Sequence, residues 1–332
     1  MFAREIAVRP TVLVALVAIA LGLAPAVAAP RGLTAQDVNS AELKANGKAA
    51  QAANIKAQVL LDRAGFSPGA IDGREGENFE NALRAFQKKN ALGESGKLDQ
   101  ATWDRLTQNA APALIDYTIT AVDVKGPFAE KIPAKYEEKA KLKRLDYTSA
   151  AEMLAERFHM DQEFLGTLNP GKDLDEAGST ILVANVNVKP VSLGAKAARL
   201  EVDKQNNQVR VLGSDGALLA AYPASVGSEE KPAPSGTLKV VRAAQNPTYT
   251  YNPEFKFRGV KADRELKIAP GPNNPVGLVW IALDQKTYGI HGTSEPSRIG
   301  KTESHGCVRL TNWDALALAK VVRKGMPVEF ID

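Results

Sequence analysis

Cysteine and histidine are scarce in this chain of 332 residues, which holds one cysteine, three histidines and an aromatic content of 6%. Exported proteins commonly use cysteines in pairs as disulfide staples, and a single thiol cannot form an intramolecular one. Cys307 is therefore buried filler, half of an intermolecular bridge or a reactive group. Its sequence neighbours must decide among the three.

A large charge excess of one sign is also missing. Lys and Arg number 42 against 38 for Asp and Glu, and the formal net charge of +4 is not gathered into one stretch. This balance gives no support to nucleic acid as a partner. The length and an apolar content of 44% instead allow two or three packed domains.

The N-terminal apolar run, over residues 11–23, is shorter than the ~20 apolar residues that a membrane-spanning helix needs. It follows a basic start and precedes small residues at Ala26 and Ala28. This order is typical of a secretory signal peptide, here residues 1–28 with cleavage after Ala28. We therefore expect an exported protein.

Residues 50–108 are predicted to form a small domain of three helices around a Gly/Asp loop. The residues expected to face inward at helical spacing are Ile55, Val59, Leu60, Phe79, Ala82, Leu83, Phe86, Trp103 and Leu106. A calcium loop at Asp72 is excluded because oxygen ligands are absent at alternate positions. The region resembles the peptidoglycan-binding domain of many wall hydrolases and transpeptidases. The segments that carry this resemblance are Gly69–Gly73, Ala82–Gln87, Leu92–Gly93, Gly96–Asp99 and Thr102–Trp103.

Residues 112–190 are predicted to hold a linker and a small α+β module. An extended stretch broken by Gly-Pro comes first. Ser149 can cap the helix that follows, with Glu152 placed to complete a capping box. His159 ends this helix, where capping or a surface position is expected. With a second helix and a strand over residues 180–184, the region resembles a LysM-type glycan-binding module, and a helical spacer is the alternative.

From residue 197 to 332, alternating apolar and polar residues are typical of β-strands. An Asn206-Asn207 turn joins two such segments into a hairpin. Thr311 begins a helix near the C-terminus, with Asp314 three residues on. This region predicts a mainly β domain of ordinary single-domain size with a C-terminal helix. Its further strands are expected at 218–225, 236–241, 278–283, 287–291 and 328–331.

Two of the three histidines lie within 16 residues of the only cysteine. A thiol attacks carbonyls as the thiolate, and a neighbouring imidazole is the usual group that lowers its pKa. His291 is expected to end a strand, with Gly292 allowing a sharp backbone turn after it, and His305 lies two residues before Cys307. Gly306 would leave space for a substrate and free backbone N–H groups to face an oxyanion.

The residues around Cys307 are similar to the signature of the YkuD-type L,D-transpeptidase catalytic domain, and the resemblance extends over residues 197–332. The resemblance implies that Cys307 is acylated and that His291 is its base. It implies supporting roles, in shaping the loop, donating to an oxyanion and meeting a substrate carboxylate, for Ser304, His305, Gly306 and Arg309. The matching residues are His291-Gly292-Thr293, Gly300, Ser304 to Leu310 and Asn312, with a Pro-x-Gly-like turn at Pro234 to Thr237.

The same resemblance implies a peptidoglycan L,D-transpeptidase in the periplasm or cell wall, with stem peptides and glycan as partners and no metal or organic cofactor. Cys307 would form a thioester with a tetrapeptide stem at the bond between the diamino acid and D-Ala. An amine of a neighbouring stem would then complete a 3-3 crosslink. Water as acceptor would make the protein an L,D-carboxypeptidase, and an outer-membrane lipoprotein as acceptor would make it an anchoring enzyme.

Two other classes of protein stay open. His291, His305 and Cys307 could bind zinc in a wall hydrolase, although the His-Gly-Cys spacing leaves no carboxylate base in register. A non-catalytic wall-binding protein would use the N-terminal modules alone and would leave the Cys/His cluster unexplained. An inert buried cysteine is disfavoured because the residues flanking Cys307 fit a core strand badly. Arg309 has the alternative of a surface ion pair.

Overall fold

The computed structural model describes residues 1, 32–43, 46–187, 196–228, 231–255, 262–302 and 306–332. All of the predicted signal peptide except Met1 lies outside these residues, so the signal stays a prediction. In the described ranges, no helix is both long and apolar enough to cross a membrane. Residues Gly32–Asp332 belong to one contact-defined unit.

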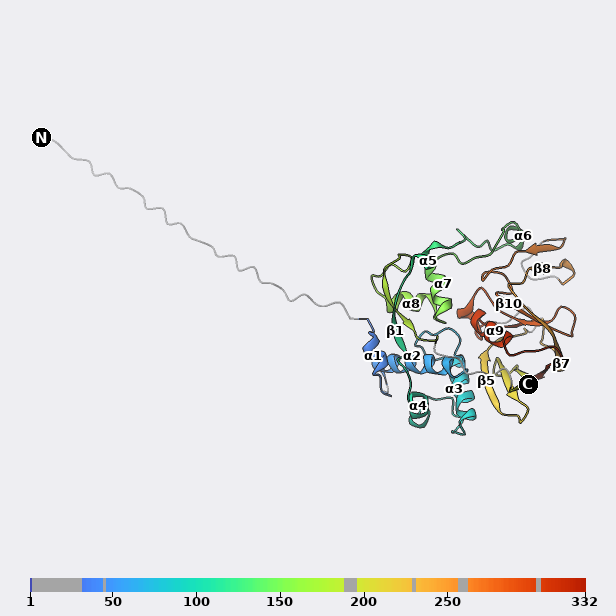
Figure 1. The fold of residues 1–332 in the computed structure, drawn as a ribbon, viewed down its shortest axis with the longest axis horizontal. Coiled ribbons are helices and arrows are strands. Elements are labelled where there is room, and N and C mark those ends of the chain that lie inside the picture. Colours follow the sequence, from blue (N-terminus) through green and yellow to red (C-terminus); the bar gives the residue numbers. More distant parts are fainter. Residues whose placement is uncertain (2–31, 44–45, 188–195, 229–230, 256–261, 303–305) are drawn as a thin grey trace. The chain divides into compact units, whose positions relative to one another are not determined.

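The helical domain forms as its periodicity predicts. Its three helices are α2 (Gly47–Arg63), α3 (Glu77–Lys89) and α4 (Gln100–Thr107), and a short helix α1 (Ala35–Asn39) precedes them and packs on α2 (Figure 1). All nine residues predicted to face inward are buried. Asp99 caps α4 by accepting from the Thr102 N–H, and the buried Gln87 amide ties the preceding loop by bonding Gly96 and Lys97.

The middle module contains the two predicted helices and the predicted strand at residues 180–184, and its extended stretch contributes a further strand and a short helix that were not predicted, with a second short helix after them. Antiparallel β1 and β2 pair from Leu114 opposite Ala184 to Thr118 opposite Thr180. The Ser149 hydroxyl caps α7, but the Glu152 carboxylate accepts from the Thr148 N–H, so the predicted capping box is displaced by one residue. The elements are β1 (Leu114–Thr118), α5 (Ala121–Lys125), α6 (Tyr136–Lys139), α7 (Ala150–Arg157), α8 (Gln162–Leu168) and β2 (Thr180–Ala184).

The C-terminal domain is built on a nine-stranded sheet in the order β5-β4-β3-β13-β7-β10-β11-β12-β6. β8 (Tyr249–Tyr251) and β9 (Leu266–Ile268) form a separate pair, and the predicted helix is α9 (Asn312–Ala319), capped by Thr311. The strands of the large sheet are β3 (Ala197–Asp203), β4 (Gln208–Gly213), β5 (Leu218–Pro223), β6 (Ser225–Val226), β7 (Gly236–Gln245), β10 (Val279–Leu283), β11 (Gly289–His291), β12 (Val308–Arg309) and β13 (Pro327–Ile331).

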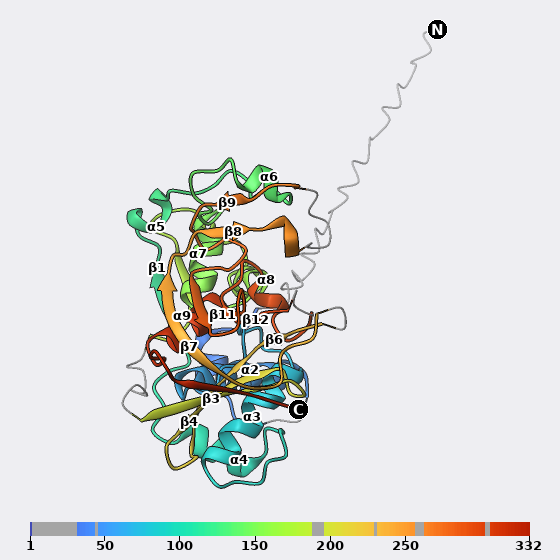
Figure 2. The same cartoon turned by 90° about the vertical axis from the view of Figure 1, so that its right-hand side faces the viewer.

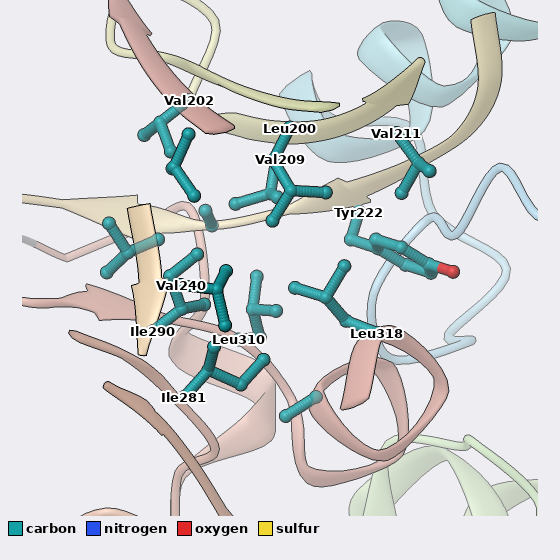
Figure 3. Close-up of a cluster of buried hydrophobic side chains, with 14 of the residues drawn as sticks. Leu200, Val202, Val209, Val211, Tyr222, Val240, Ile281, Ile290, Leu310 and Leu318 are labelled. Carbon is teal, nitrogen blue, oxygen red and sulfur yellow. The ribbon is translucent and has the colours of Figure 1, made fainter. Parts of the chain in front are cut away.

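Apolar side chains from both ends of this sheet meet in one core. Figure 3 shows Leu200 and Val209 on one side facing Ile281 and Ile290 on the other, with Leu318 of α9 beside them. All five are fully buried. Burying one such side chain stabilises the fold by roughly 1.5–3 kcal/mol, so this core holds β11 and β12 firmly in place.

The three domains share cores and main-chain hydrogen bonds. A second apolar cluster joins α2 to the middle module, and a third joins the helical domain to β5 through Leu218 and Ala221. The Ser67 N–H donates to the Ala221 carbonyl at 2.9 Å. Asn78, at the start of α3, donates to the Ile299 carbonyl at 2.8 Å, within the segment that separates His291 from Cys307. The N-terminal modules are therefore docked on the C-terminal domain.

His159 directly follows the C-cap of α7 and lies where the three domains meet, with 25% of its side chain exposed. Its Nδ1 is 3.1 Å from Asp62 of α2, and its ring stacks on Trp313 of α9 at 5.1 Å. Its backbone φ of 55° is in the left-handed region, which few residues other than glycine adopt. The residue thus makes contacts between domains, which helical periodicity cannot reveal.

Candidate active site

The predicted nucleophile and base are held by two adjacent strands. His291 ends β11 and Cys307 directly precedes β12, and these strands run parallel, with His291 opposite Arg309. The Cys307 sulfur lies 3.8 Å from the Thr287 carbonyl oxygen, and the Gly289 N–H faces it at the start of β11. Gly289 is two residues from His291, roughly 7 Å along a strand. The predicted pair is thus brought to two neighbouring strands of the large sheet.

His291 is buried, with 6% of its surface exposed. Its Nδ1 is 2.7 Å from the Gly292 carbonyl oxygen. A carbonyl only accepts, so Nδ1 carries the proton of the neutral ring and Nε2 is left as the acceptor. Trp280, opposite His291 on β10, stacks on the ring at 5.6 Å and 22°. The ring is held in the tautomer that a general base requires.

The protonation states follow from burial. Burial, opposed by the Gly292 carbonyl and assisted by the charge of Arg309, lowers the pKa of His291 to about 4. Burial raises the pKa of the Cys307 thiol, and the Gly289 N–H and the Lys231 charge oppose this only in part. At neutral pH the resting pair is therefore a neutral thiol and a neutral imidazole.

This result differs from the expectation that His291 lowers the thiol pKa. Within the described part of the chain, no hydrogen bond joins His291 to Cys307. A neutral ring also has no charge with which to stabilise a thiolate. The sequence identified both residues but could not show how deeply the imidazole is buried.

Two positions of the motif, Gly292 and Gly306, require glycine for different structural reasons. Gly306 has a φ of +116°, which side chains rarely adopt. Gly292 is not among the described glycines with positive φ, so its backbone conformation does not require glycine. A Cβ on Gly292 would instead lie 2.3 Å from Asn312 Oδ1. Glycine is needed there because a side-chain amide packs directly on the backbone.

The remaining predicted site residues are only partly described. Ser304 and His305 lie outside the described residues, so their supporting roles stay predictions. Arg309 is half-buried, and its Nη2 donates to the Thr302 hydroxyl at 3.2 Å. In the parallel pair it shares a sheet face with His291. A substrate carboxylate beside the imidazole would meet this guanidinium.

The zinc alternative receives no support from the described ranges, in which no group of three or more His, Cys, Asp and Glu side chains could hold a metal ion. His305, the second histidine of that alternative, lies outside these ranges. Metal removal is therefore an arm of the experiments below.

An aromatic cluster near the site was not predicted. Tyr136 of α6 stacks on Tyr251 of β8 at 5.7 Å and lies 5.9 Å from Tyr249. Burial raises the pKa of Tyr136, and the nearby Arg309 guanidinium opposes this rise. Burial also raises the pKa of Tyr249, which lies near Cys307. Figure 2 shows α6 beside β9. Sequence reasoning missed Tyr136 because residues 135–143 indicate only a basic helical stretch.

Comparison with known proteins agrees with this fold and site. Residues 197–330 match the family model described as "L,D-transpeptidase catalytic domain". Residues 52–106 match the model described as "Putative peptidoglycan binding domain". The two matches fall on the sheet domain and on the helical domain.

Several curated relatives are similar over the catalytic domain. "Putative L,D-transpeptidase YkuD" of Bacillus licheniformis is 29% identical over 53% of this chain and 90% of its own length. "Putative L,D-transpeptidase YqjB" of Bacillus subtilis is 31% identical over 40% of this chain and 69% of its own. "Probable L,D-transpeptidase YbiS" of Escherichia coli is 30% identical, and the chain spans 61% of its length. The chain belongs to the L,D-transpeptidase family.

Proposed function

We propose that this protein is an exported peptidoglycan L,D-transpeptidase in which Cys307 carries the acyl group and His291 moves the proton. The observation that carries the proposal is the geometry of β11. The Gly289 N–H faces the sulfur at the start of this strand, and a buried imidazole with its Nδ1 bonded to Gly292 ends it.

The proposed chemistry follows from the resting protonation states. As sulfur attacks the carbonyl between the diamino acid and D-Ala, the thiol proton moves to Nε2 of His291. The carbon–nitrogen bond breaks, the departing amine of D-Ala takes this proton, and a thioester remains on Cys307. An acceptor amine then attacks the thioester, His291 takes the amine proton, and the proton returns to the sulfur. Because Gly306 lacks a side chain, neighbouring backbone N–H groups can face the oxyanion.

Arg309 supports the choice of substrate. Its guanidinium lies on the same sheet face as His291, and a guanidinium forms strong paired hydrogen bonds with a carboxylate. A peptide stem offers such a carboxylate. We propose an amine of a second stem as acceptor, giving a 3-3 crosslink. Water or a lipoprotein amine would proceed through the same thioester.

Muropeptide mass spectrometry tests the proposal. The full-length protein is incubated with purified disaccharide-tetrapeptide, and the masses of the protein and of the products are measured. We expect a transient protein adduct equal to the stem minus D-Ala, and dimers joined through two diamino acids. Released D-Ala without dimers would assign a carboxypeptidase. The absence of both the adduct and any product would contradict the acyl-enzyme mechanism.

Wall binding by the helical domain is tested with the whole chain. An isolated fragment of residues 50–110 would expose the apolar face that packs on Leu218 and Ala221, so its behaviour would not report on the native domain. We expect the full-length Cys307→Ala variant to pellet with purified sacculi even when excess soluble tetrapeptide occupies the catalytic site. Release by the soluble peptide would show that the catalytic site alone provides the attachment.

A further inference from the structure

Asn312 contacts the backbone just before β10 and just after β11, the strand that ends at His291. It is the first residue of α9, and only 1% of its surface is exposed. Its Oδ1 accepts from the Leu278 N–H at 3.0 Å. A Cβ placed on Gly277 or Gly292 would lie 2.1 Å or 2.3 Å from that oxygen. The amide oxygen therefore lies against the residue whose carbonyl holds the His291 ring.

The other end of this amide is held by a different domain. Asn312 Nδ2 donates to Glu156 Oε2 at 3.0 Å and to Oε1 at 3.2 Å. Glu156 belongs to α7 of the middle module and is 8% exposed. The Tyr147 hydroxyl also donates to this carboxylate, at 3.2 Å. A buried carboxylate is costly unless its oxygens are hydrogen-bonded, and these contacts supply that need.

The two ends of the Asn312 amide have opposite requirements. The Leu278 N–H needs an acceptor, while the Glu156 oxygens and the Pro272 carbonyl, 3.3 Å from Nδ2, need a donor. A flipped amide would lose its bonds at both ends. Glu156 thus fixes the orientation in which the amide oxygen packs on Gly292.

We infer that Glu156 is a positioning residue for the reaction, acting through Asn312 and Gly292 to hold the His291 ring. The inference rests on the proposed function, because it assumes that His291 is the base. It means that the middle module completes the support of the active site. Nothing in the motif around Cys307 reveals this, because Glu156 lies far from that motif in the sequence.

The role of Glu156 is orientation and not charge. Burial raises its pKa to about 7, against the hydrogen bonds from Asn312 and Tyr147, and either protonation state keeps an oxygen that accepts from Asn312. The His291 pKa is set by burial, Gly292 and Arg309, with no contribution from Glu156. Glutamine should therefore replace Glu156 adequately, and alanine should not.

The first experiment compares Glu156→Ala, Glu156→Gln and the control Glu152→Ala in the full chain. Glu152 is one turn earlier on α7 and lines the same cavity of about 230 Å³, but it bonds Asn273 and not Asn312. We expect Glu156→Ala to lower kcat roughly 10- to 100-fold with little change in KM, because small misplacements of catalytic groups are costly. The kcat values of Glu156→Gln and Glu152→Ala should stay within about threefold of the wild-type kcat, which is the scatter expected for a change away from the reacting groups.

A second readout does not depend on any substrate. With ¹⁵N-labelled histidine, the wild type should show His291 protonated at Nδ1, and Glu156→Ala should lose this single tautomer while Glu156→Gln keeps it. Wild-type protein without acyl transfer would overturn the proposed function and leave this test standing. An unchanged tautomer and kcat in Glu156→Ala, or equal losses in the Ala and Gln variants, would overturn the inference.

A compensating pair covers the case in which Glu156→Ala fails to fold. Asn312→Asp places an acceptor against the Glu156 carboxylate and should lower kcat in the same range. Adding Glu156→Gln supplies an amide N–H that can donate to the new carboxylate at position 312. The kcat of the double variant should therefore be at least about tenfold higher than that of Asn312→Asp alone. Failure to recover, with thermal unfolding like that of the single variant, would contradict a positioning role.

Discussion

Replacement of Cys307 by alanine is expected to abolish acyl transfer, by at least about 10⁴-fold, while leaving a cooperatively folded protein. The loss is large because the sulfur forms the bond to the substrate in the proposed mechanism. The stability change is small, of the order of 1 kcal/mol, because the thiol is half-buried and only one atom is removed. Adduct formation by intact-protein mass spectrometry and thermal unfolding measure the two effects.

Metal removal gives this experiment a second arm. Wild-type protein treated with EDTA should transfer the acyl group at its untreated rate, whereas a zinc hydrolase would lose activity. Residual turnover in purified Cys307→Ala would overturn the cysteine mechanism. A loss restored by added zinc would favour the metal alternative.

Removal of the His291 imidazole should lower the rate of acyl transfer without a comparable change in the pKa of the Cys307 thiol. His291→Ala is expected to lower acyl transfer by about 10²- to 10⁴-fold, as for the loss of a general base. The pH dependence of Cys307 alkylation should move by less than about half a unit. The reason is that burial lowers the pKa of His291 to about 4, so the ring carries no charge near neutrality.

Iodoacetamide labelling rates against pH, with mass spectrometry of the Cys307 peptide, provide the measurement. In wild type, the labelling midpoint should lie above the ordinary thiol pKa of about 8.5, because burial disfavours the thiolate. Acyl transfer should fail as pH drops through about 4, because the protonated ring cannot accept a proton. An upward shift of a full unit in His291→Ala would instead show a resting thiolate–imidazolium pair. A larger shift in His305→Ala would assign the base to His305.

Local patterns predicted the elements that depend on local chemistry. The apolar period of α3, the hairpin at Asn207 and the Thr311 cap all appear as expected, because each is specified within a few residues. The spacing of His291 and Cys307 likewise indicated a shared site, and both reach the same pair of strands.

Features that depend on packing between domains were not predictable in this way. Glu156 is one of two acidic residues on α7, and only the packing of α7 against α9 shows that it bonds Asn312. The low pKa of His291 depends on burial, which follows from the complete sheet. Tyr136 reaches the site because α6 packs on β9, and helical period carries no information about that contact.

The docked contacts of Asn78 and Ser67 change how the helical domain would serve the enzyme. A domain on a flexible linker raises the local concentration of a catalytic site over every stem within its reach. A domain joined to the catalytic core through shared packing sets one distance and one direction between the bound glycan and Cys307. Cys307 would then react only with those stems that lie at a fixed distance along the glycan chain from the bound site, and nearer stems would not react.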